Sequence, residues 1–307
     1  MSGVEIQPFS DQHLDAAARL LAGRHEQHRR ALPLLAADDF AERIGREFGR
    51  EGASAFVACR GDTVVGYLIG HVLPPLRSMH VGSAAHAVAE PEIVRDLYAV
   101  AAASWAEAGH LRHTVNVPAT DAGLVDAWFR LSFGQQAAYA IREVTAEPPI
   151  DAGVVIRAGN GADVEVGVRL QRVLSKQHTL PPVFSQRMPR GDDEIREEWL
   201  ETLAEEGVAF LIAESGGEAV GGLLLSRTER DFVDPSTNID LSFAATTPGV
   251  RGSGVGRALT ARALRWAAEE GYRTMTADWR VANLLASRFW SRRGFRPAFL
   301  RLYRSIP

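Results

Sequence analysis

The residues with the clearest chemical potential form a glycine-rich run, "TTPGVRGSGVGRAL", over 246–259. It stands directly after a strand-like segment and before a helix-like one, and its glycines are Gly249, Gly252, Gly254 and Gly256. A turn of this kind leaves backbone N–H groups without partners at the positive end of a helix dipole, where phosphate oxygens bind. Glycine keeps side chains out of that approach. The run therefore predicts a phosphate-binding loop, and the alternative is a tight turn that only caps the helix.

Two well-known phosphate-loop patterns do not fit this run. The P-loop ends in Gly-Lys-Ser/Thr, whereas Arg257 and Ala258 follow Gly256 here. In the dinucleotide pattern Gly-x-Gly-x-x-Gly, the third glycine would fall on Arg257 or Leu259. Neither a nucleoside triphosphate nor a dinucleotide is therefore indicated as the ligand.

The elements that must position this loop can be read from the second half of the chain. Apolar spacing predicts helices over 163–177, 192–207, 255–271 and 283–294. Alternation and β-branched content predict strands over 154–159, 208–215, 219–227, 236–246, 273–279 and 298–306. This order predicts an α/β (α+β) fold in which a twisted, mixed and largely antiparallel sheet is flanked by helices.

The first half of the chain repeats the layout of the second. Identical residues recur at an offset of 162 positions: Gly109 and Gly271, Trp128 and Trp290, Phe133 and Phe295, Arg142 and Arg304. A proline-rich joint, "TAEPPIDAG", covers 145–153. We therefore expect a tandem duplication with domains at 1–147 and 152–307, each of ordinary domain size.

Composition limits the partners and the compartment. A formal charge of −4 on 307 residues argues against a general attraction to nucleic acid or anionic membrane. The chain shows no leader-like start and no uninterrupted apolar run of about 18 residues. Cys59 is the single cysteine, which excludes an intrachain disulfide and a cysteine metal cluster. We expect a cytoplasmic protein without a metal site, in which Cys59 packs in a core.

The glycine run also resembles a family pattern. "RGSGVGRAL" is similar to the pyrophosphate loop Arg/Gln-x-x-Gly-x-Gly/Ala of the GNAT N-acyltransferases, with Arg251, Gly254 and Gly256 in the defining places. Downstream, "NLLASRFWSRRGF" over 283–295 resembles that family's later helix, Asn-x-x-Ala followed by an aromatic residue shortly before Gly-Phe. The resemblance covers nearly all of 152–307 and implies the tandem GNAT fold.

The resemblance implies acetyl-CoA or another short acyl-CoA as cofactor. Its pantetheine arm would pair with the backbone of the strand that ends at Ala245 and Thr246, and Asn283 would contact the cofactor, a nearby water or only cap its own helix. The amides and side chains holding the pyrophosphate would come from Arg251, Gly252, Ser253, Gly254, Val255, Gly256 and Arg257. The first half reads "HAVAEPEIVRDLY" at the equivalent place and has Asp121 where Asn283 stands. Because carboxylates repel a pyrophosphate, we expect a degenerate first domain without cofactor binding.

The resemblance implies acyl transfer from a thioester to an amine, which needs a base. Asn238, Asp240 and Ser242 share one face of the strand by the two-residue period, and Asp240 is the ionisable one among them. The alternative is that Asp240 reaches solvent or pairs with an arginine such as Arg227. Many relatives use a tyrosine as general acid, but Trp290 stands at that position here.

Three explanations for the missing acid stay open. Trp290 could stabilise the sulfur by its N–H, Tyr303 or Ser291 could substitute, or the thiolate could leave unassisted. Because Trp128 matches Trp290 in the first half, we favour a packing role for both tryptophans.

The acceptor site is the least determined part. The family resemblance assigns it to the connection over 176–193, where His178 is a candidate substrate contact beside Asn238 and Ser242. Phe184 and Met188 suggest apolar surface, and Arg187 and Arg190 would attract acids. We expect an acetyl-CoA-dependent N-acetyltransferase that acts on a small-molecule amine or a protein amino group, in an unspecified oligomeric state. The alternative is a non-catalytic acyl-CoA-binding sensor or assembly module.

Overall fold

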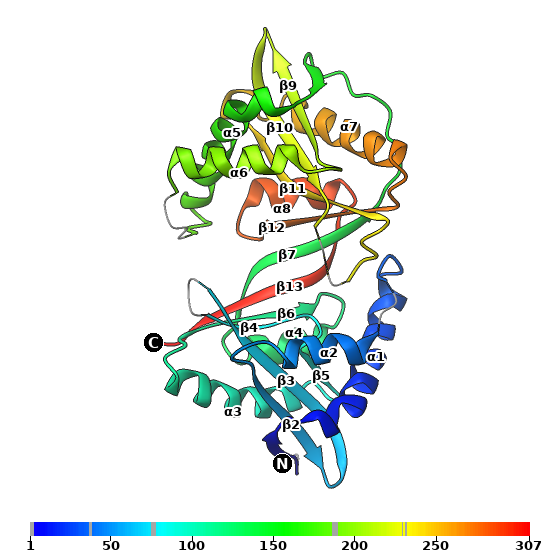
Figure 1. Ribbon diagram of the computed structural model, residues 1–307, viewed down its shortest axis with the longest axis vertical. Coiled ribbons are helices and arrows are strands. Elements are labelled where there is room, and N and C mark those ends of the chain that lie inside the picture. Colours follow the sequence, from blue (N-terminus) through cyan, green and yellow to red (C-terminus); the bar gives the residue numbers. More distant parts are fainter. Residues whose placement is uncertain (1–2, 37–38, 75–77, 186–189, 229, 231) are drawn as a thin grey trace. The chain divides into compact units, whose positions relative to one another are not determined.

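The computed structural model describes residues 3–36, 39–74, 78–185, 190–228, 230 and 232–307. It divides into two compact units (Figure 1). The first unit comprises Met1–Tyr139 together with Pro297–Pro307, and the second comprises Ala140–Arg296.

The first unit is a mixed sheet covered on both faces by helices. Its strands follow the order β1-β2-β3-β4-β6-β13, and β5 pairs with β3. The strands are β1 (Glu5–Pro8), β2 (Ser54–Arg60), β3 (Thr63–Leu73), β4 (Ser78–Val81), β5 (His86–Val88), β6 (Arg112–Pro118) and β13 (Arg296–Ser305). The helices are α1 (Leu14–Ala31), α2 (Phe40–Phe48), α3 (Ile93–Glu107) and α4 (Ala122–Phe129).

Alternation along β3 separates the two helical layers of the first unit. Gly66 and Gly70 lie under α3, because a Cβ at either position would come within 3.0 Å of Ile93 or Trp105 side-chain atoms. His71 points the other way and reaches Glu47 of α2. The core between these layers is rich in aromatic residues, and Trp128 is completely buried against Phe133 and Tyr98 rings.

The second unit has the same organisation. Its strand order is β7-β12-β11-β10-β9-β8, where β7 (Gly134–Glu143) contributes Ala140–Glu143. The other strands are β8 (Val155–Ala158), β9 (Ala209–Ser215), β10 (Glu218–Ser226), β11 (Asn238–Thr246) and β12 (Thr274–Arg280). The helices are α5 (Val164–Thr179), α6 (Asp192–Ala204), α7 (Val255–Glu269) and α8 (Leu284–Arg292).

The glycine pair of β10 shows how helices reach both faces of this sheet. A Cβ on Gly221 would press on Leu259 of α7, whereas one on Gly222 would press on Leu170 of α5. Successive residues thus face opposite layers, as the pleat requires. The predicted helices and strands of the second half are confirmed, as is the α/β fold with a largely antiparallel mixed sheet.

The compact units do not coincide with the predicted domains at 1–147 and 152–307. β13 is the last strand of the second repeat, yet it pairs antiparallel with β6 in the first unit, from Phe299 opposite Pro118 to Ser305 opposite Arg112. β7 closes the first repeat and ends in the second unit. Each repeat therefore contributes its closing strand, in part or nearly whole, to the other unit. A single boundary at the proline-rich joint cannot describe this exchange of strands.

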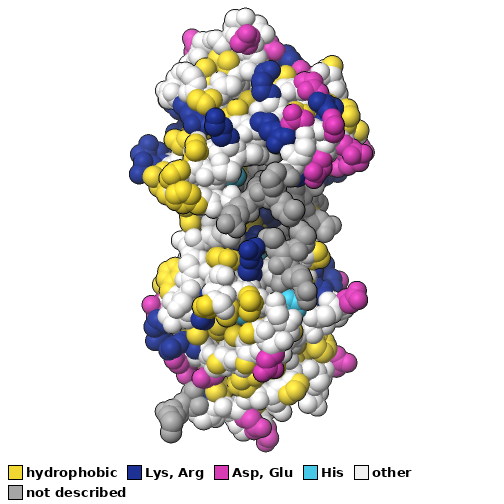
Figure 2. Space-filling view, turned by 90° about the vertical axis from the view of Figure 1, so that its left-hand side faces the viewer, with side chains coloured by type: hydrophobic (Ala, Val, Ile, Leu, Met, Phe, Trp, Pro, Cys, Tyr) yellow, Lys and Arg dark blue, Asp and Glu magenta, His cyan; other side chains and the backbone are white. Residues whose placement is uncertain are grey.

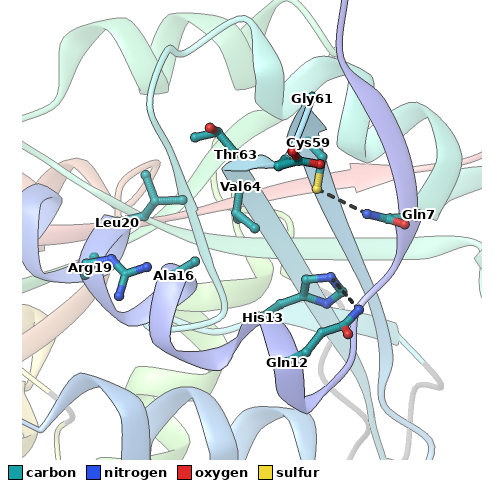
Figure 3. Close-up of a pocket in the computed structure, with 11 residues that line it drawn as sticks. Gln7, Gln12, His13, Ala16, Arg19, Leu20, Cys59, Gly61, Thr63 and Val64 are labelled. Carbon is teal, nitrogen blue, oxygen red and sulfur yellow. Dashed lines mark hydrogen bonds between the residues drawn. The ribbon is translucent and has the colours of Figure 1, made fainter.

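An open depression of about 730 Å³ lies in the first unit, between β1, the start of α1 and the β2–β3 turn (Figure 3). His13, Arg19 and Asp62 line it together with Cys59. The Cys59 thiol accepts a hydrogen bond from Gln7 Nε2 at 3.2 Å and is 7% exposed, so it packs in the core as predicted.

Candidate active site

The glycine run forms the connection from β11 to α7 in the second unit. Gly252 and Gly254 have φ angles of 85° and 99°, in the left-handed region that favours glycine, and Gly254 is the N-cap of α7. Within the described chain, the backbone N–H groups of Gly252 and of 254–257 have no hydrogen-bond acceptor. The loop therefore presents several unpaired amides at a helix N-terminus, the arrangement that binds phosphate oxygens.

The sheet opens next to this loop. The parallel ladder between β11 and β12 runs from Asn238 opposite Thr274 to Leu241 opposite Ala277, and both strands continue beyond it. β11 remains paired with β10 up to Thr246 opposite Gly221. Its other backbone edge is therefore without a partner strand over 243–246 in the described structure. An extended amide chain could hydrogen-bond along that edge.

The two arginines of the loop are exposed. Arg251 donates from Nη1 to Gln177 Oε1 at 3.1 Å, and Arg257 lies in the first turn of α7. Both side chains are therefore accessible to an anionic ligand at the loop. The Ser253 hydroxyl donates to the Val250 carbonyl at 2.7 Å, which stabilises the turn itself.

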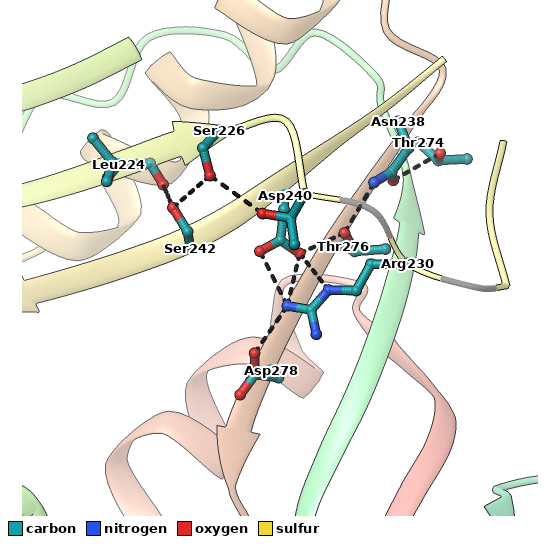
Figure 4. A network of polar contacts seen from close by, with 10 residues as sticks. Leu224, Ser226, Arg230, Asn238, Asp240, Ser242, Thr274, Thr276 and Asp278 are labelled. Atoms are coloured by element: carbon teal, nitrogen blue, oxygen red, sulfur yellow. Dashed lines mark hydrogen bonds and ion pairs between the residues drawn. The ribbon is translucent and has the colours of Figure 1, made fainter. Parts of the chain in front are cut away.

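Asp240 lies at the inner end of the opening and is 1% exposed. Arg230 donates to both of its carboxylate oxygens, from Nε at 3.1 Å and from Nη2 at 3.0 Å, and the Thr276 hydroxyl donates to Oδ1 at 2.6 Å (Figure 4). Burial raises the pKa of the Asp240 carboxyl, although Arg230 and Thr276 favour its ionised form. The carboxylate is thus already occupied by a cation of its own chain.

Arg230 is shared by a second carboxylate. Its Nη2 also donates to Asp278 Oδ1 at 3.0 Å, and the Asp278 side chain is 46% exposed. Burial opposes the charge on Arg230, but attraction to Asp240 and then Asp278 outweighs it and raises the pKa of the guanidinium. Arg227, the arginine that the sequence offered as a partner for Asp240, instead donates to the Tyr272 hydroxyl at 3.2 Å.

The other residues predicted beside Asp240 also enter the network in Figure 4. Asn238 Nδ2 donates to Thr276 Oγ1 at 3.0 Å, which links the amide to the Asp240 carboxylate through one hydroxyl. Ser242 is exposed at a β-bulge, where the register shifts between Leu224 and Leu225, and its hydroxyl accepts from Ser226 at 3.0 Å. Asn238 therefore fixes the network, whereas Ser242 is accessible from outside.

The later helix carries Asn283 and Trp290. Asn283 is the N-cap of α8, since its Oδ1 accepts from the Ala286 amide at 3.4 Å, and it is 5% exposed. Trp290 is 8% exposed and packs edge-on against Phe289 and Phe295, with ring centroids 4.8 and 5.4 Å apart. The geometry favours packing for Trp290, as its match with the buried Trp128 suggested.

Neither alternative general acid lies in the Asp240 network. The Ser291 hydroxyl donates to the Ser287 carbonyl of its own helix at 2.9 Å. Tyr303 belongs to β13 in the first unit, opposite Thr114.

The predicted acceptor connection is only partly described, since Arg187 and Met188 lie outside the described residues. His178 is the penultimate residue of α5 and is 9% exposed, so it is not an exposed loop histidine. Phe184 is 67% exposed, and Arg190 pairs with Glu198 of α6. On the face of the second unit that Figure 2 displays, basic and acidic side chains are interspersed, so neither charge dominates it.

The first unit differs at the equivalent loop. Residues 89–92 connect β5 to α3, half as many as the residues 247–254 that connect β11 to α7. The first amides of α3 donate to this short connection, Ile93 to the Glu90 carbonyl at 3.1 Å and Val94 to the Pro91 carbonyl at 3.3 Å. No free amide cradle comparable to that of α7 is therefore formed.

Side chains also join the strands of the first unit where they diverge. The β4–β6 ladder ends with Val81 opposite Val115, and beyond it His86 Nε2 donates to the Asn116 carbonyl at 2.9 Å. The guanidinium of Arg24 donates to the carbonyls of Ser83 and His86, and burial lowers the pKa of Arg24 to about 10.

Comparison with known proteins agrees with this architecture. Residues 173–295 match the profile of the acetyltransferase (GNAT) family. A segment of 102 residues is 35% identical to an aminoglycoside N(6')-acetyltransferase type 1 of Stenotrophomonas maltophilia, and this match covers 32% of the chain but 65% of the relative, just under two thirds of its length.

Two solved structures share the fold over both units. A GCN5-related N-acetyltransferase of Sphaerobacter thermophilus has a TM-score of 0.63 at 15% identity, covering 98% of this chain and 95% of its own. A tandem GNAT protein from the clavulanic acid biosynthesis pathway has a TM-score of 0.56 at 16% identity and covers 98% of each chain. Among the described residues, no helix is long and apolar enough to cross a membrane, and no group of three or more His, Cys, Asp or Glu side chains could hold a metal ion.

Proposed function

Because residues 173–295 match the profile of the acetyltransferase (GNAT) family, we propose that the chain is an acetyl-CoA-dependent N-acetyltransferase acting on a primary amine. The observation that carries the proposal is the set of unpaired amides at the start of α7, next to the unpaired edge of β11. The amides can bind the pyrophosphate of acetyl-CoA, and the strand edge can pair with its amide-containing pantetheine arm.

The residues present fit acyl-CoA. The pyrophosphate would be held by the amides of the loop 252–257, with Arg251 and Arg257 adding charge-assisted hydrogen bonds. The backbone of 243–246 would pair with the pantetheine arm, as the strand edge is unpaired there. Asn283 caps α8 and would contact the cofactor only through its remaining polar atoms. When bound, acetyl-CoA supplies an acetyl thioester whose carbonyl carbon is open to a nucleophile.

The amine nitrogen must lose two protons during the reaction. An alkyl amine, whose pKa is about 10, is mostly protonated at neutral pH and cannot attack in that form. In our proposal the ammonium gives its first proton to Asp240. The nitrogen then forms a C–N bond as the C–S bond breaks, and the departing sulfur takes the second nitrogen proton. Trp290 packs in the core, so the proposal assigns no general acid and relies on the modest basicity of the thiolate.

The acceptor proposed first is a small molecule with a basic amino group. Support comes from the curated relative, which is named as an aminoglycoside acetyltransferase, and from the carboxylate of Asp278, which is the exposed acid of the Asp240 network. Ser242 and His178 are proposed as further acceptor contacts. If acetyl-CoA binds but no amine is acetylated, the chain is instead an acyl-CoA sensor or assembly module.

We further propose that the first unit does not bind acyl-CoA. Its connection from β5 to α3 is short, the amides at the start of α3 are already paired, and His86 and Arg24 bond to the backbone where the strands diverge. Glu90 and Glu92 would add repulsion for a pyrophosphate.

Calorimetric titration with acetyl-CoA tests both proposals. We expect one site per chain, and at least tenfold weaker binding for Gly254→Val, because valine is strained at a φ of 99°. Gly161→Val is the matched control, since Gly161 lies in the same unit, has no positive φ and faces open space. Two sites per chain would refute the degenerate first unit, and no binding would refute the acyl-CoA site.

A further inference from the structure

The candidate active site already contains a cation of this chain. The Arg230 guanidinium lies between Asp240 and Asp278, which belong to neighbouring strands, and hydrogen-bonds to both at 3.0–3.1 Å. Asp240 closes the inner end of this arrangement at 1% exposure, and the half-exposed Asp278 side chain forms its outer end. The two acids therefore form a cation site with a buried and an open end.

The acids and the cation are held differently. Asp240 lies in the ladder opposite Thr276, and Thr276 is held in turn by Asn238, so the position of the inner carboxylate is fixed by two strands. Arg230 comes from the connection between β10 and β11 rather than from a strand. Exchange of the cation would therefore leave the sheet and both carboxylates in place.

We propose that the acceptor enters as an ammonium cation, replaces the Arg230 guanidinium between Asp278 and Asp240, and gives its proton to Asp240. This inference rests on the proposed function and narrows the acceptor to basic amines. An N–H bond of the ammonium breaks and an O–H bond forms on the carboxyl. Charge is conserved in the exchange, because one monovalent cation replaces another between the same two carboxylates.

The exchange also explains how an occupied carboxylate becomes a base. While Arg230 is bound, its charge and hydrogen bonds favour ionised Asp240 against the effect of burial. After the exchange, the cation beside Asp240 is an ammonium, which can transfer a proton as the guanidinium cannot, and burial of the carboxylate favours that transfer. Asp240 therefore accepts a proton only when an amine has displaced its resident partner. Arg230 is a positioning residue in this scheme.

Arg230→Gln separates displacement from a fixed structural pair. Spermidine is the probe amine, and its KM is measured together with kcat and the affinity for acetyl-CoA. We expect KM to fall about tenfold with acetyl-CoA affinity unchanged, because the internal competitor is gone. Arg227→Gln is the matched control, an exposed arginine outside the network, and should behave as wild type. A higher KM for Arg230→Gln, or a kcat reduced tenfold or more, would show that Arg230 stays in place during turnover.

A binding measurement keeps this inference separate from the proposed function. Calorimetric titration with spermidine, in the presence of CoA, should show about tenfold tighter binding to Arg230→Gln than to wild type even if no acetyl transfer occurs. Equal affinity, or binding to neither protein, overturns the inference, whereas failure of acetyl transfer alone overturns only the enzyme assignment. If Arg230→Gln does not fold, Arg230→Lys decides in the same way, with an expected threefold gain because an ammonium makes fewer bonds to the two acids.

Discussion

The role of Asp240 depends on its bonds as much as on its place in the sheet. A buried carboxylate with a bidentate arginine and a hydroxyl donor is stable in its ionised form. Without these donors, burial would raise the pKa of the same carboxyl further. The site combines both conditions, since the arginine holds the charge and burial raises the pKa of the carboxyl.

Asp240→Asn tests this residue as the base. We expect kcat to fall by a factor of about 10²–10⁴, the usual contribution of a general base, with acetyl-CoA affinity unchanged. In the wild-type protein the ionised base is lost as pH falls through the raised pKa of Asp240. The acid limb of kcat/KM should therefore lie above pH 3.8, the ordinary value for aspartate, and should disappear in the variant.

A matched control for this variant lies in the connection between β10 and β11. Asp234 is exposed and accepts from Ser236 at 2.9 Å, outside the Asp240 network, so Asp234→Asn should keep the wild-type pH profile. Unchanged turnover in Asp240→Asn would contradict the base assignment.

At the residue scale the sequence predicted Asp240 as a site residue but did not identify Arg230 as its partner. The two-residue period places Asn238 and Asp240 on one face, and Thr276 joins them in the structure. Arg227 and Arg230 both lie shortly before that strand, and no periodicity applies to a connection, so the choice between them depends on three-dimensional geometry. Asp278 follows Thr276 by two residues, a signal that could have placed it on the same face.

At the scale of elements, the two repeats share a strand register but differ in chemistry. His80 of β4 stands opposite Thr114 of β6, as Asp240 stands opposite Thr276. His80 Nδ1 and the Thr114 hydroxyl are 2.9 Å apart, and burial lowers the pKa of His80 to about 3. The first repeat therefore keeps a neutral pair where the second keeps a charged one.

This register provides a comparison of two threonines in equivalent places. Thr276→Val removes a donor to a buried carboxylate and an acceptor for Asn238, so we expect a loss of about 2 kcal/mol in the free energy of unfolding. Thr114→Val removes a bond to a neutral partner and should cost about 1 kcal/mol. Urea unfolding of both variants measures the difference, and a larger loss for Thr114→Val would contradict the charged role of the Asp240 network.

The elements themselves were largely predictable, because apolar periodicity and glycine positions are local signals. The opening between β11 and β12 could be predicted only from the family resemblance. It depends on where the pairing of the two strands ends, which is after Leu241. The sequence of the first half also shows that it has no glycine loop. It does not show the hydrogen bonds that His86 and Arg24 make where the strands diverge, because their partners are distant in sequence.

At the scale of the whole molecule, sequence repeat and compact unit are different divisions. β13 ends the second repeat but completes the core of the first unit, where Leu302 is fully buried and Phe299 packs edge-on against His28 at 5.0 Å. A boundary in the sequence groups each strand with the strands next to it along the chain. Strands pair instead by the sheet edge and register available to them, so the proline-rich joint could not show that β13 belongs to the first unit.

Leu302→Ala should therefore destabilise the first unit, although Leu302 lies near the end of the second repeat. Removing a fully buried leucine typically costs about 2–5 kcal/mol, and Leu302 belongs to the core of the first unit. Hydrogen exchange followed by mass spectrometry should show faster exchange in α1, β3 and β6, with β9, β10 and β11 as protected as in wild type. Leu285→Ala, at an exposed position of α8, should change neither set. Faster exchange confined to 140–296 would mean that the last strand supports the second unit after all, and that the linear division at 147 and 152 describes the folded units better.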